Sequence, residues 1–375
     1  MNVRAYLDNA ATTAPLPSAI EAARRVMEQS WGNPSSLHEA GKQARAELNA
    51  ARASVARALS CAPDCVTFTS GGTESINTAL RGAAWHNRRI GKHIVSTAIE
   101  HEATLETLAA LRDEGFEITL VPPGRDGVVP LASLVAAMRD DTILLSIMAV
   151  NNETGAVQPY VEAVRALKAR NARALVHVDA VQAFLKLPLA LEGIDLVSVS
   201  AHKLGGLKGC GALYARRGLK LRPYLTGGGQ ESGLRSGTEG MPAIAAFGAA
   251  CAVRHAVFDE NAARLAQLRA NLLDRLARLD LPCVVHSPQD GAPHIVNLSL
   301  CRGRSEVYVR ALSDCGVCVS GGSACARGKR SYVLSAMKLD SRAIDAALRV
   351  SLCPETTEDD LAAFCAALRD AADLF

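Results

Sequence analysis

The chain has 375 residues, of which 49% are hydrophobic and only 4% are aromatic. This length allows two domains and a large buried core. Its 41 basic and 38 acidic side chains leave a net charge of +3, so the composition gives no support for a nucleic-acid-binding or membrane-binding surface.

The sequence shows no features of a membrane or secreted protein. No apolar run reaches the roughly 20 residues that span a bilayer, and residues 1–8 lack the apolar segment of a signal peptide. Eleven scattered cysteines do not form the even, regular pattern of a disulfide framework. Two short spacings, Cys61 to Cys65 and Cys315 to Cys318, lack the second half of a four-ligand metal site. We therefore expect a cytoplasmic protein with reduced thiols and no bound metal.

A glycine turn between a strand and a helix is the first candidate binding element. The elements predicted before residue 90 are helices over 18–29, 42–59 and 76–87 and a strand over 65–69. Gly71, Gly72 and Thr73 join this strand to the last of these helices. Such a turn points free backbone N–H groups and the positive end of the helix at an anion. Gly72 and Thr73 are therefore candidates for binding a phosphate, although plain packing would use the same turn.

Strands and helices alternate between residues 65 and 215, which predicts βαβ units and a largely parallel sheet. The remaining strands of this region are expected over 93–97, 117–121, 142–150, 175–179, 194–199 and 211–215. Polar residues follow the ends of these strands: His101, Asn152, Asp179, Ser200 and Lys203. Ligands of such sheets bind outside the carboxyl ends of the strands. We therefore expect one crevice, although His101 could be structural and Asn152 could cap its turn.

Lys203 is the residue on which the functional prediction depends. It follows a buried strand that ends near Ser200 and His202, and an amine in that position suits a Schiff base with pyridoxal phosphate (PLP). This chemistry also needs an acidic partner for the ring nitrogen. Asp179 ends the preceding strand, 24 residues upstream. The two residues together predict a cofactor between them, whereas either one alone would be ordinary.

The chain after residue 215 predicts a polar loop, a helical bridge and a second domain. The loop at 227–238 is rich in glycine and hydroxyl groups, so it is either a mobile surface loop or a second phosphate contact that reaches a partner subunit. A helical pattern over 242–279 is the expected bridge between the domains. The elements expected beyond it are strands over 284–286, 295–300 and 317–319 and a helix over 306–314.

Two side chains of the second domain are candidates for chemistry. Cys325 lies in the glycine-rich, cationic segment 320–330, where nearby positive charge favours the nucleophilic thiolate. The alternative is a basic exposed loop with an incidental cysteine. Arg349 lies in the apolar run 346–352, where its guanidinium would need a carboxylate partner such as that of a substrate.

Characteristic motifs are distributed over nearly the whole chain. In chain order they are LDNAATT, NPSSLHEAG, FTSGGTES, EHEA, NNETG, HVDAVQ, SAHK, GGGQESGLRSGTE, SGGSAC and LRVSL. In this order and spacing they resemble the cysteine desulfurase family of PLP-dependent enzymes. The resemblance implies an α/β fold of the aspartate-aminotransferase type, with a mostly parallel seven-stranded sheet in a large PLP-binding domain at 13–250. A smaller α+β domain of residues 1–12 and 251–375 would carry the segment with Cys325.

The resemblance also implies roles for individual residues. The implied catalytic residues are Lys203 as the Schiff-base lysine, Cys325 as the sulfur-accepting nucleophile and His101 over the cofactor ring. The implied cofactor-binding residues are Gly72, Thr73, Ser200 and His202 at the phosphate, Asp179 at the ring nitrogen, Asn152 and Gln182 near the ring hydroxyl, and Thr238 from the other subunit of a homodimer. Arg349 and Asn33 are assigned to substrate binding.

The reaction implied is the conversion of L-cysteine to L-alanine, with the sulfur held as a persulfide on Cys325. An acceptor protein for iron–sulfur cluster assembly or tRNA thiolation would then take the sulfur. Three departures from the family pattern are a short segment between Cys325 and Ser331, Gly206-Leu207 in place of a Gly-Pro pair, and Ser232 and Gly240 in place of an Arg and an Asn. Alternative functions are a selenocysteine lyase, another PLP-dependent aminotransferase or β-lyase, and a non-catalytic PLP-binding scaffold.

Overall fold

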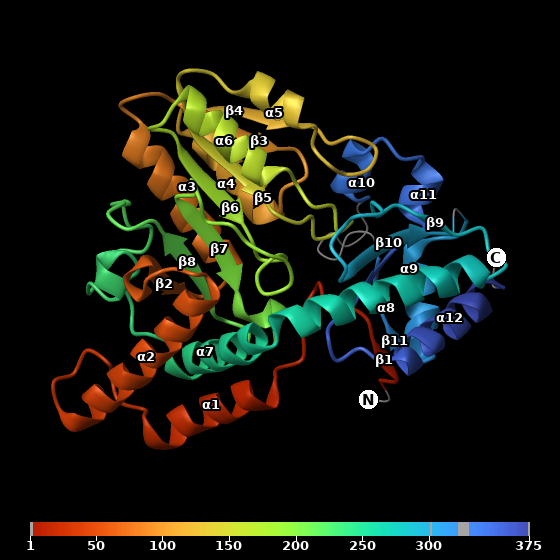
Figure 1. The fold of residues 1–375 in the computed structure, drawn as a ribbon, viewed down its shortest axis with the longest axis horizontal. Helices are drawn as coiled ribbons and strands as arrows, with labels where there is room; N and C mark the ends of the chain where they lie inside the picture. Colours follow the sequence, from red (N-terminus) through yellow and green to blue (C-terminus); the bar gives the residue numbers. More distant parts are fainter. Residues whose placement is uncertain (1–2, 301, 322–329, 374–375) are drawn as a thin grey trace.

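The computed structural model describes residues 3–300, 302–321 and 330–373, and its largest element is a seven-stranded sheet with the order β2-β8-β7-β6-β5-β3-β4 (Figure 1). Its strands are β2 (Val66–Thr69), β3 (His93–Thr97), β4 (Glu117–Val121), β5 (Thr142–Met148), β6 (Leu175–Asp179), β7 (Leu196–Ser200) and β8 (Gly211–Ala215). Within this sheet, β8 alone runs antiparallel to its neighbours. The predicted α/β fold with a mostly parallel sheet is therefore confirmed.

Helices cover both faces of this sheet, which explains why its central strands are apolar along their whole length. The strands β5, β6 and β7 are buried at every residue. On one face the core includes α3 (Gly72–Asn87) and α4 (Glu102–Asp113). On the other face it includes α5 (Leu131–Ala137) and α6 (Tyr160–Arg170). Because the parallel strands all point the same way, their carboxyl ends meet at one edge of the sheet.

A bent pair of helices covers the region 242–279, where the sequence predicted a helical bridge. The helix α7 (Met241–Ala256) packs with α1 (Pro17–Gln29) and α2 (Glu39–Ala58), whereas α8 (Phe258–Arg278) runs to a second core (Figure 1). Val257 between them leaves the helical conformation, with φ −122° and ψ 35°. The predicted helical pattern is confirmed, and it is divided into two helices at Val257 because the two halves pack against different cores. No single helix in the described part of the chain is long and apolar enough to cross a membrane. The helices α7 and α8 reach that length and apolarity only together, and the angle between them is 77°.

The second core is built around an antiparallel sheet with the order β12-β13-β10-β9. Its strands are β9 (Val284–Val285), β10 (Ile295–Ser299), β12 (Ser320–Gly321) and β13 (Ala347–Ser351), and β1 (Ala5–Tyr6) pairs separately with β11 (Val317–Cys318). The helices that pack in this core are α8, α9 (Ser305–Asp314) and α12 (Glu358–Ala372). The short helices α10 (Tyr332–Ala336) and α11 (Ser341–Asp345) instead bury residues in the core of the large sheet. Ala5 and Leu7 are buried in the same core as residues of α8 and α12. We retain the division into 13–250 and 1–12 with 251–375 as a proposal. Among the described residues, the second core contains only members of the smaller part, whereas the core of the large sheet also contains Val333 and Ile344.

Candidate active site

A cavity of about 340 Å³ lies at the carboxyl ends of the parallel strands. This volume is in the range of small-molecule sites. The predicted residues that line it are Gly72, Thr73, His101, Asn152, Asp179, Gln182, Ser200, His202, Lys203 and Arg349. Asp179 and Lys203 therefore share one cavity, as the two strand ends predict. Asn33 and Thr238 are not among the residues that line it.

The start of α3 forms an anion-binding end of this cavity. Gly71, the residue before the helix, has a φ of 155° and no side chain to cap the first turn. The N–H groups of that turn are therefore available to a ligand. A Cβ atom on Gly72 would come within 3.0 Å of a methyl carbon of Val181 and 3.8 Å of the Cβ of Ser200. A larger residue at Gly72 would fill the space that a phosphate group needs.

Asp179 is the last residue of β6 and is almost fully buried. Its Oδ1 accepts a hydrogen bond of 2.9 Å from the backbone N–H of Val181. Burial raises the pKa of Asp179, while this hydrogen bond and the electrostatic effects of the nearby His101 and Lys203 act in the opposite direction. A cationic ring nitrogen beside Asp179 would compensate the cost of burying the charged carboxylate. The residue therefore fits the predicted contact to a pyridinium nitrogen.

The amine of Lys203 is held at the cavity by the N-terminal segment of the chain. Its Nζ donates hydrogen bonds of 2.7 Å to the carbonyl oxygens of Ala10 and Ala11. His202 beside it contacts the Oγ1 of Thr12 through Nδ1 at 3.1 Å. Burial and the charge of Lys203 lower the pKa of His202 to about 4, so this imidazole is neutral near pH 7. The N-terminal segment was not predicted to contact Lys203.

The imidazole of His101 precedes α4 and acts as the N-cap of that helix. Its Nδ1 accepts a hydrogen bond of 3.1 Å from the backbone N–H of Ala103. Since a neutral imidazole carries one proton, this contact places the proton on Nε2. His101 thus has both a structural role and a ring that lines the cavity. The predicted stacking of this ring over a cofactor remains a prediction.

The two predicted amide side chains differ in how they are bonded. Gln182 donates from Nε2 to the carbonyl oxygen of Ala10 at 2.9 Å, and its Oε1 accepts from Lys186 at 3.4 Å. Asn152 has a buried Oδ1 that finds no hydrogen-bond donor among the described residues. A buried acceptor without a donor is costly unless a ligand supplies one. Asn152 is therefore the better candidate for a contact to the ring hydroxyl of PLP.

Arg349 on β13 is 2% exposed and reaches the cavity from the second core. Its two terminal nitrogens donate to the carbonyl oxygen of Asn152 at 2.9 Å, to Oδ1 of Asp8 at 3.1 Å and to Oγ of Ser320 at 3.3 Å. The carboxylate partner that the sequence required is thus Asp8, which was not predicted. The Nε of Arg349 is buried and has no partner among the described residues. The Nε–H of the guanidinium is therefore available to the carboxylate of a substrate.

Two buried glutamates near the cavity were also missed by the sequence reasoning. Thr97 and the backbone of Met148 donate to Oε1 of Glu100 at 2.7 and 2.9 Å, and burial raises the pKa of Glu100 to about 8. Ser331 donates to Oε2 of Glu153 at 2.5 Å, and burial raises the pKa of Glu153 to about 7 against the opposing effects of Ser331 and Arg349. The only sequence signal was that these glutamates lie beside the predicted residues at the strand ends.

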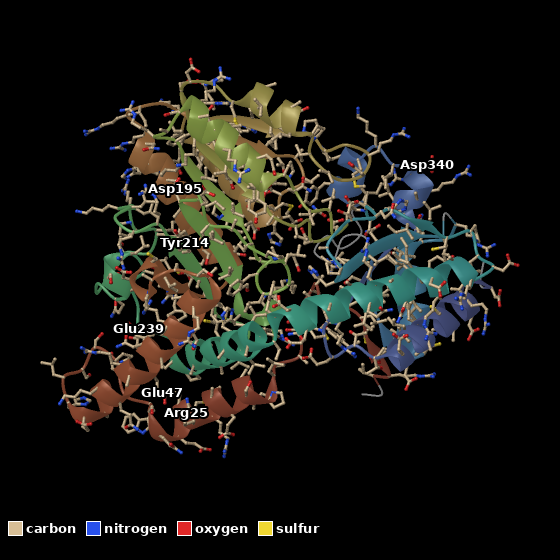
Figure 2. All side chains as sticks on the ribbon, viewed as in Figure 1. Arg25, Glu47, Asp195, Tyr214, Glu239 and Asp340 are labelled. Carbon is tan, nitrogen blue, oxygen red and sulfur yellow. The ribbon has the colours of Figure 1, made fainter. Side chains whose placement is uncertain are left out.

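A buried carboxylate at the opposite end of β7 provides a contrast. Asp195, labelled in Figure 2, binds Lys168 at 2.6 Å and Arg216 at 2.7 Å. It also accepts from the backbone N–H of Val176 at 2.9 Å. Both of its oxygens are therefore used within the protein, which is typical of a structural ion pair. Asp179 has no comparable direct ion pair in the described residues, which is why it remains available to a ligand.

Cys325 lies outside the described residues, as do most residues of the predicted segment 320–330. The described residues on either side, Ser320 and Ser331, contact Arg349 and Glu153 of the cavity. In the described part of the chain, no group of three or more His, Cys, Asp or Glu side chains could hold a metal ion.

Comparisons with known proteins place the chain among PLP-dependent enzymes. The family model described as aminotransferase class-V matches residues 5–364. A cysteine desulfurase IscS from Methanosarcina thermophila is 39% identical over 364 residues, which is 96% of this chain and 90% of that protein. A NifS/IcsS protein homolog from Lactobacillus delbrueckii subsp. bulgaricus is 40% identical over 370 residues, which is 96% of this chain and 95% of that protein.

Solved structures show the same similarity in three dimensions. A structure described as a NifS-like protein has a TM-score of 0.93 at 36% identity, covering 99% of this chain and 100% of that one. A structure described as SspA in complex with cysteine has a TM-score of 0.82 at 30% identity, covering 94% of this chain and 100% of that one.

Proposed function

The chain belongs to the class-V aminotransferase family, and on this premise we propose that it is a PLP-dependent cysteine desulfurase. Its substrate would be L-cysteine and its carbon product L-alanine. The observation that carries the proposal is the single cavity that holds Lys203, Asp179 and Arg349. Two buried atoms without partners among the described residues, Oδ1 of Asn152 and Nε of Arg349, fit a cofactor hydroxyl and a substrate carboxylate.

Each side of the cavity would hold one part of the cofactor. The first turn of α3 at Gly72 and Thr73 would bind the phosphate, together with Ser200 and His202. Asp179 would bind the ring nitrogen, and Asn152 the ring hydroxyl. When bound, PLP supplies an aromatic ring that accepts electrons from the α-carbon of an amino acid.

The protein's own groups would bind the substrate and move its proton. Arg349 would hold the carboxylate of L-cysteine through its Nε–H, which fixes the α-carbon beside Lys203. The amine of Lys203 would remove the α-proton, because it is a base at the strand end that faces the same cavity. Asp8 and the carbonyl of Asn152 keep the guanidinium in place for this contact.

Sulfur would leave the substrate by attack of the Cys325 thiolate. The thiolate sulfur forms a bond to the sulfur of L-cysteine, and the bond between that sulfur and Cβ breaks. The electron pair stays with Cβ, which takes up a proton and becomes the methyl group of L-alanine. The balance is L-cysteine plus one enzyme thiol giving L-alanine plus one enzyme persulfide, so no external oxidant is required.

Incubation of the purified protein with L-cysteine tests this function. We expect equal amounts of alanine and of persulfide on Cys325 by mass spectrometry, and release of sulfide after addition of dithiothreitol. The variant Cys325→Ala should keep the yellow colour of bound cofactor and bind L-cysteine, but release no sulfide. Unimpaired sulfide release by this variant would exclude the assigned nucleophile, and no alanine from the wild type would exclude the proposed reaction.

The partners and location of the protein are part of the same proposal. We propose that a sulfur-acceptor protein takes the persulfide sulfur and that the enzyme is a homodimer. Thr238 lines a separate hollow with Ser70 and Arg235, away from the cavity of its own chain, which supports a role in the site of the other subunit. The nine described cysteines are all free thiols, which supports a cytoplasmic location. Equilibrium sedimentation of the holoenzyme would test the dimer.

A further inference from the structure

The turn at residues 152–155, which follows β5, is bonded to the second core along its whole length. It receives hydrogen bonds from Arg349 to Asn152 O at 2.9 Å, from Asn297 to Glu153 O at 3.2 Å, from Ser287 to Thr154 O at 2.5 Å and from the backbone of Ala292 to Gly155 O at 2.7 Å. All four of these bonds use backbone oxygens of the turn. The turn is therefore a fixed junction between the two cores, and one of its residues, Glu153, adds a side-chain contact.

The carboxylate of Glu153 binds the residue that begins α10. Glu153 is 3% exposed and lines the cavity. Its Oε2 accepts a hydrogen bond of 2.5 Å from Oγ of Ser331. The same Oγ accepts a hydrogen bond of 3.0 Å from the backbone N–H of Leu334, so Ser331 is also the N-cap of α10. A single hydroxyl thus connects the cavity wall to the first turn of this helix.

A second hydrogen bond attaches the start of α10 to the turn that follows β3. The hydroxyl of Tyr332 donates to the carbonyl oxygen of Glu100 at 2.5 Å. In contrast, Arg330 pairs with Asp345 on the surface, where both side chains are well exposed. Exposed ion pairs contribute little to stability, whereas a buried hydrogen bond to a carboxylate contributes more. The start of α10 is therefore held by one buried and one partly buried hydrogen bond, in addition to the burial of Val333 and Leu334.

Ser331 lies six positions after Cys325 in the sequence. We propose that Glu153 is a positioning residue for sulfur transfer, which acts through Ser331 to fix the first turn of α10, the described helix that follows Cys325 in the chain. This inference rests on the proposed function, because it gives Glu153 a role only in the step that uses Cys325. Glu153 has no proposed role in binding PLP or in removal of the α-proton.

Two substitutions at Glu153 separate the hydrogen bond from the size of the side chain. Glu153→Leu removes the acceptor, and Glu153→Gln keeps a carbonyl oxygen that can accept from Ser331. We expect Glu153→Leu to slow persulfide formation on Cys325 about tenfold in a single turnover, since a buried hydrogen bond is lost and the hydroxyl of Ser331 loses its acceptor. The affinity for L-cysteine, measured by the visible spectrum of the holoenzyme, should change less than threefold. Glu153→Gln should stay within about threefold of the wild-type rate.

A second pair of variants checks the path through Ser331. Ser331→Ala should slow persulfide formation by the same factor as Glu153→Leu, and the double variant should be no slower than either one. Asp345→Asn is the matched control, because it breaks the exposed pair with Arg330 beside the same residue and should leave the rate unchanged. Hydrogen exchange of the holoenzyme adds a readout that does not depend on turnover. The α10 amides should exchange faster in Glu153→Leu and at the wild-type rate in Glu153→Gln.

The outcomes distinguish this inference from the proposed function. Normal persulfide formation and normal exchange in Glu153→Leu would overturn the inference and leave the function intact. Loss of affinity for L-cysteine in proportion to the rate would also overturn it, because Glu153 would then act on the substrate. If the wild type forms no persulfide, the proposed function fails, and the exchange of α10 still decides whether Glu153 holds this helix.

Discussion

The two walls of the cavity are built in different ways. On the wall formed by the large sheet, Gly72, Asp179 and Lys203 each lie at or just after the end of a strand, so the backbone of one sheet places them. On the wall formed by the second core, Arg349 depends on side-chain hydrogen bonds to Asp8 and Ser320. We infer that the sheet wall carries the proposed chemistry, while the second wall holds the proposed substrate through Arg349.

This difference predicts two kinds of response to substitution. Removal of a reacting group from the sheet wall should abolish the reaction, because no neighbouring residue can replace it. Removal of a contact on the second wall should weaken binding or one step, because the remaining hydrogen bonds still hold the arginine. The following variants test this distinction.

Lys203→Ala should have the largest effect. We expect turnover of L-cysteine to fall by about 10³-fold or more, since the residue proposed to remove the α-proton is lost. The variant should still bind PLP through the phosphate contacts, but the cofactor should dialyse away from it faster than from the wild type. Steady-state alanine formation and absorbance after dialysis measure the two effects. Lys208→Ala, an exposed lysine five positions later, is the control and should behave as the wild type.

Arg349→Gln should have the next largest effect, mainly on binding. Loss of one member of a buried charged pair costs about 2–5 kcal/mol, so we expect KM for L-cysteine to rise by roughly 30-fold or more. The colour of the bound cofactor should not change, because Arg349 has no proposed contact with it. A fall in kcat with unchanged KM would place Arg349 with the chemistry of the sheet wall instead. Arg342→Gln, on the surface of α11, is the matched control.

The sheet wall could be predicted from the sequence because its signals are local. The strand at 175–179 is an apolar run that ends in an aspartate, and the predicted and observed bounds agree. The strands at 93–97 and 117–121 agree equally well. Ligand sites of parallel sheets lie at the carboxyl ends of the strands, so correct strand ends were sufficient to place Asp179 and Lys203 in one cavity.

The second wall could not be predicted because its contacts are not local. The sequence indicated that Arg349 needs a carboxylate, yet its partner Asp8 is 341 positions away in the chain. The two observed helices joined at Val257 continue one apolar pattern, and only the packing against two cores shows the bend. Glu153 was missed because a glutamate in a polar turn has no sequence signal of burial. These features depend on how the two cores meet.

Glu100 lies where the two walls join and should make stability depend on pH. Its pKa is raised from 4.5 to about 8 by burial, so the folded protein keeps a proton that the unfolded chain releases above pH 4.5. The free energy of unfolding from this group therefore decreases as pH rises through the window from 4.5 to about 8, by up to about 1.4 kcal/mol per pH unit. Glu100→Gln cannot release a proton in either state. We expect its stability relative to the wild type to increase from pH 5 to pH 8.

Urea unfolding of both proteins at several pH values measures this difference. Glu106→Gln, on the exposed face of α4, is the control and should show no such trend. A constant difference between Glu100→Gln and the wild type would mean that Glu100 is ionised in the folded protein, and the join between the two walls would then contain an additional negative charge.

Ser320→Ala should have the smallest effect. It tests how much one of the hydrogen bonds that hold Arg349 contributes to substrate binding. Oγ of Ser320 donates to Asp8 at 2.7 Å and accepts from Arg349 at 3.3 Å. Arg349 keeps its bonds to Asp8 and to the carbonyl of Asn152 in this variant, so only about 1 kcal/mol is lost and KM for L-cysteine should rise about fivefold. In an Arg349→Gln background the same substitution should have no further effect, because the contact that it supports is already gone. Equal effects in both backgrounds would show that Ser320 acts on the substrate independently, and the second wall would then hold its ligand through two separate contacts.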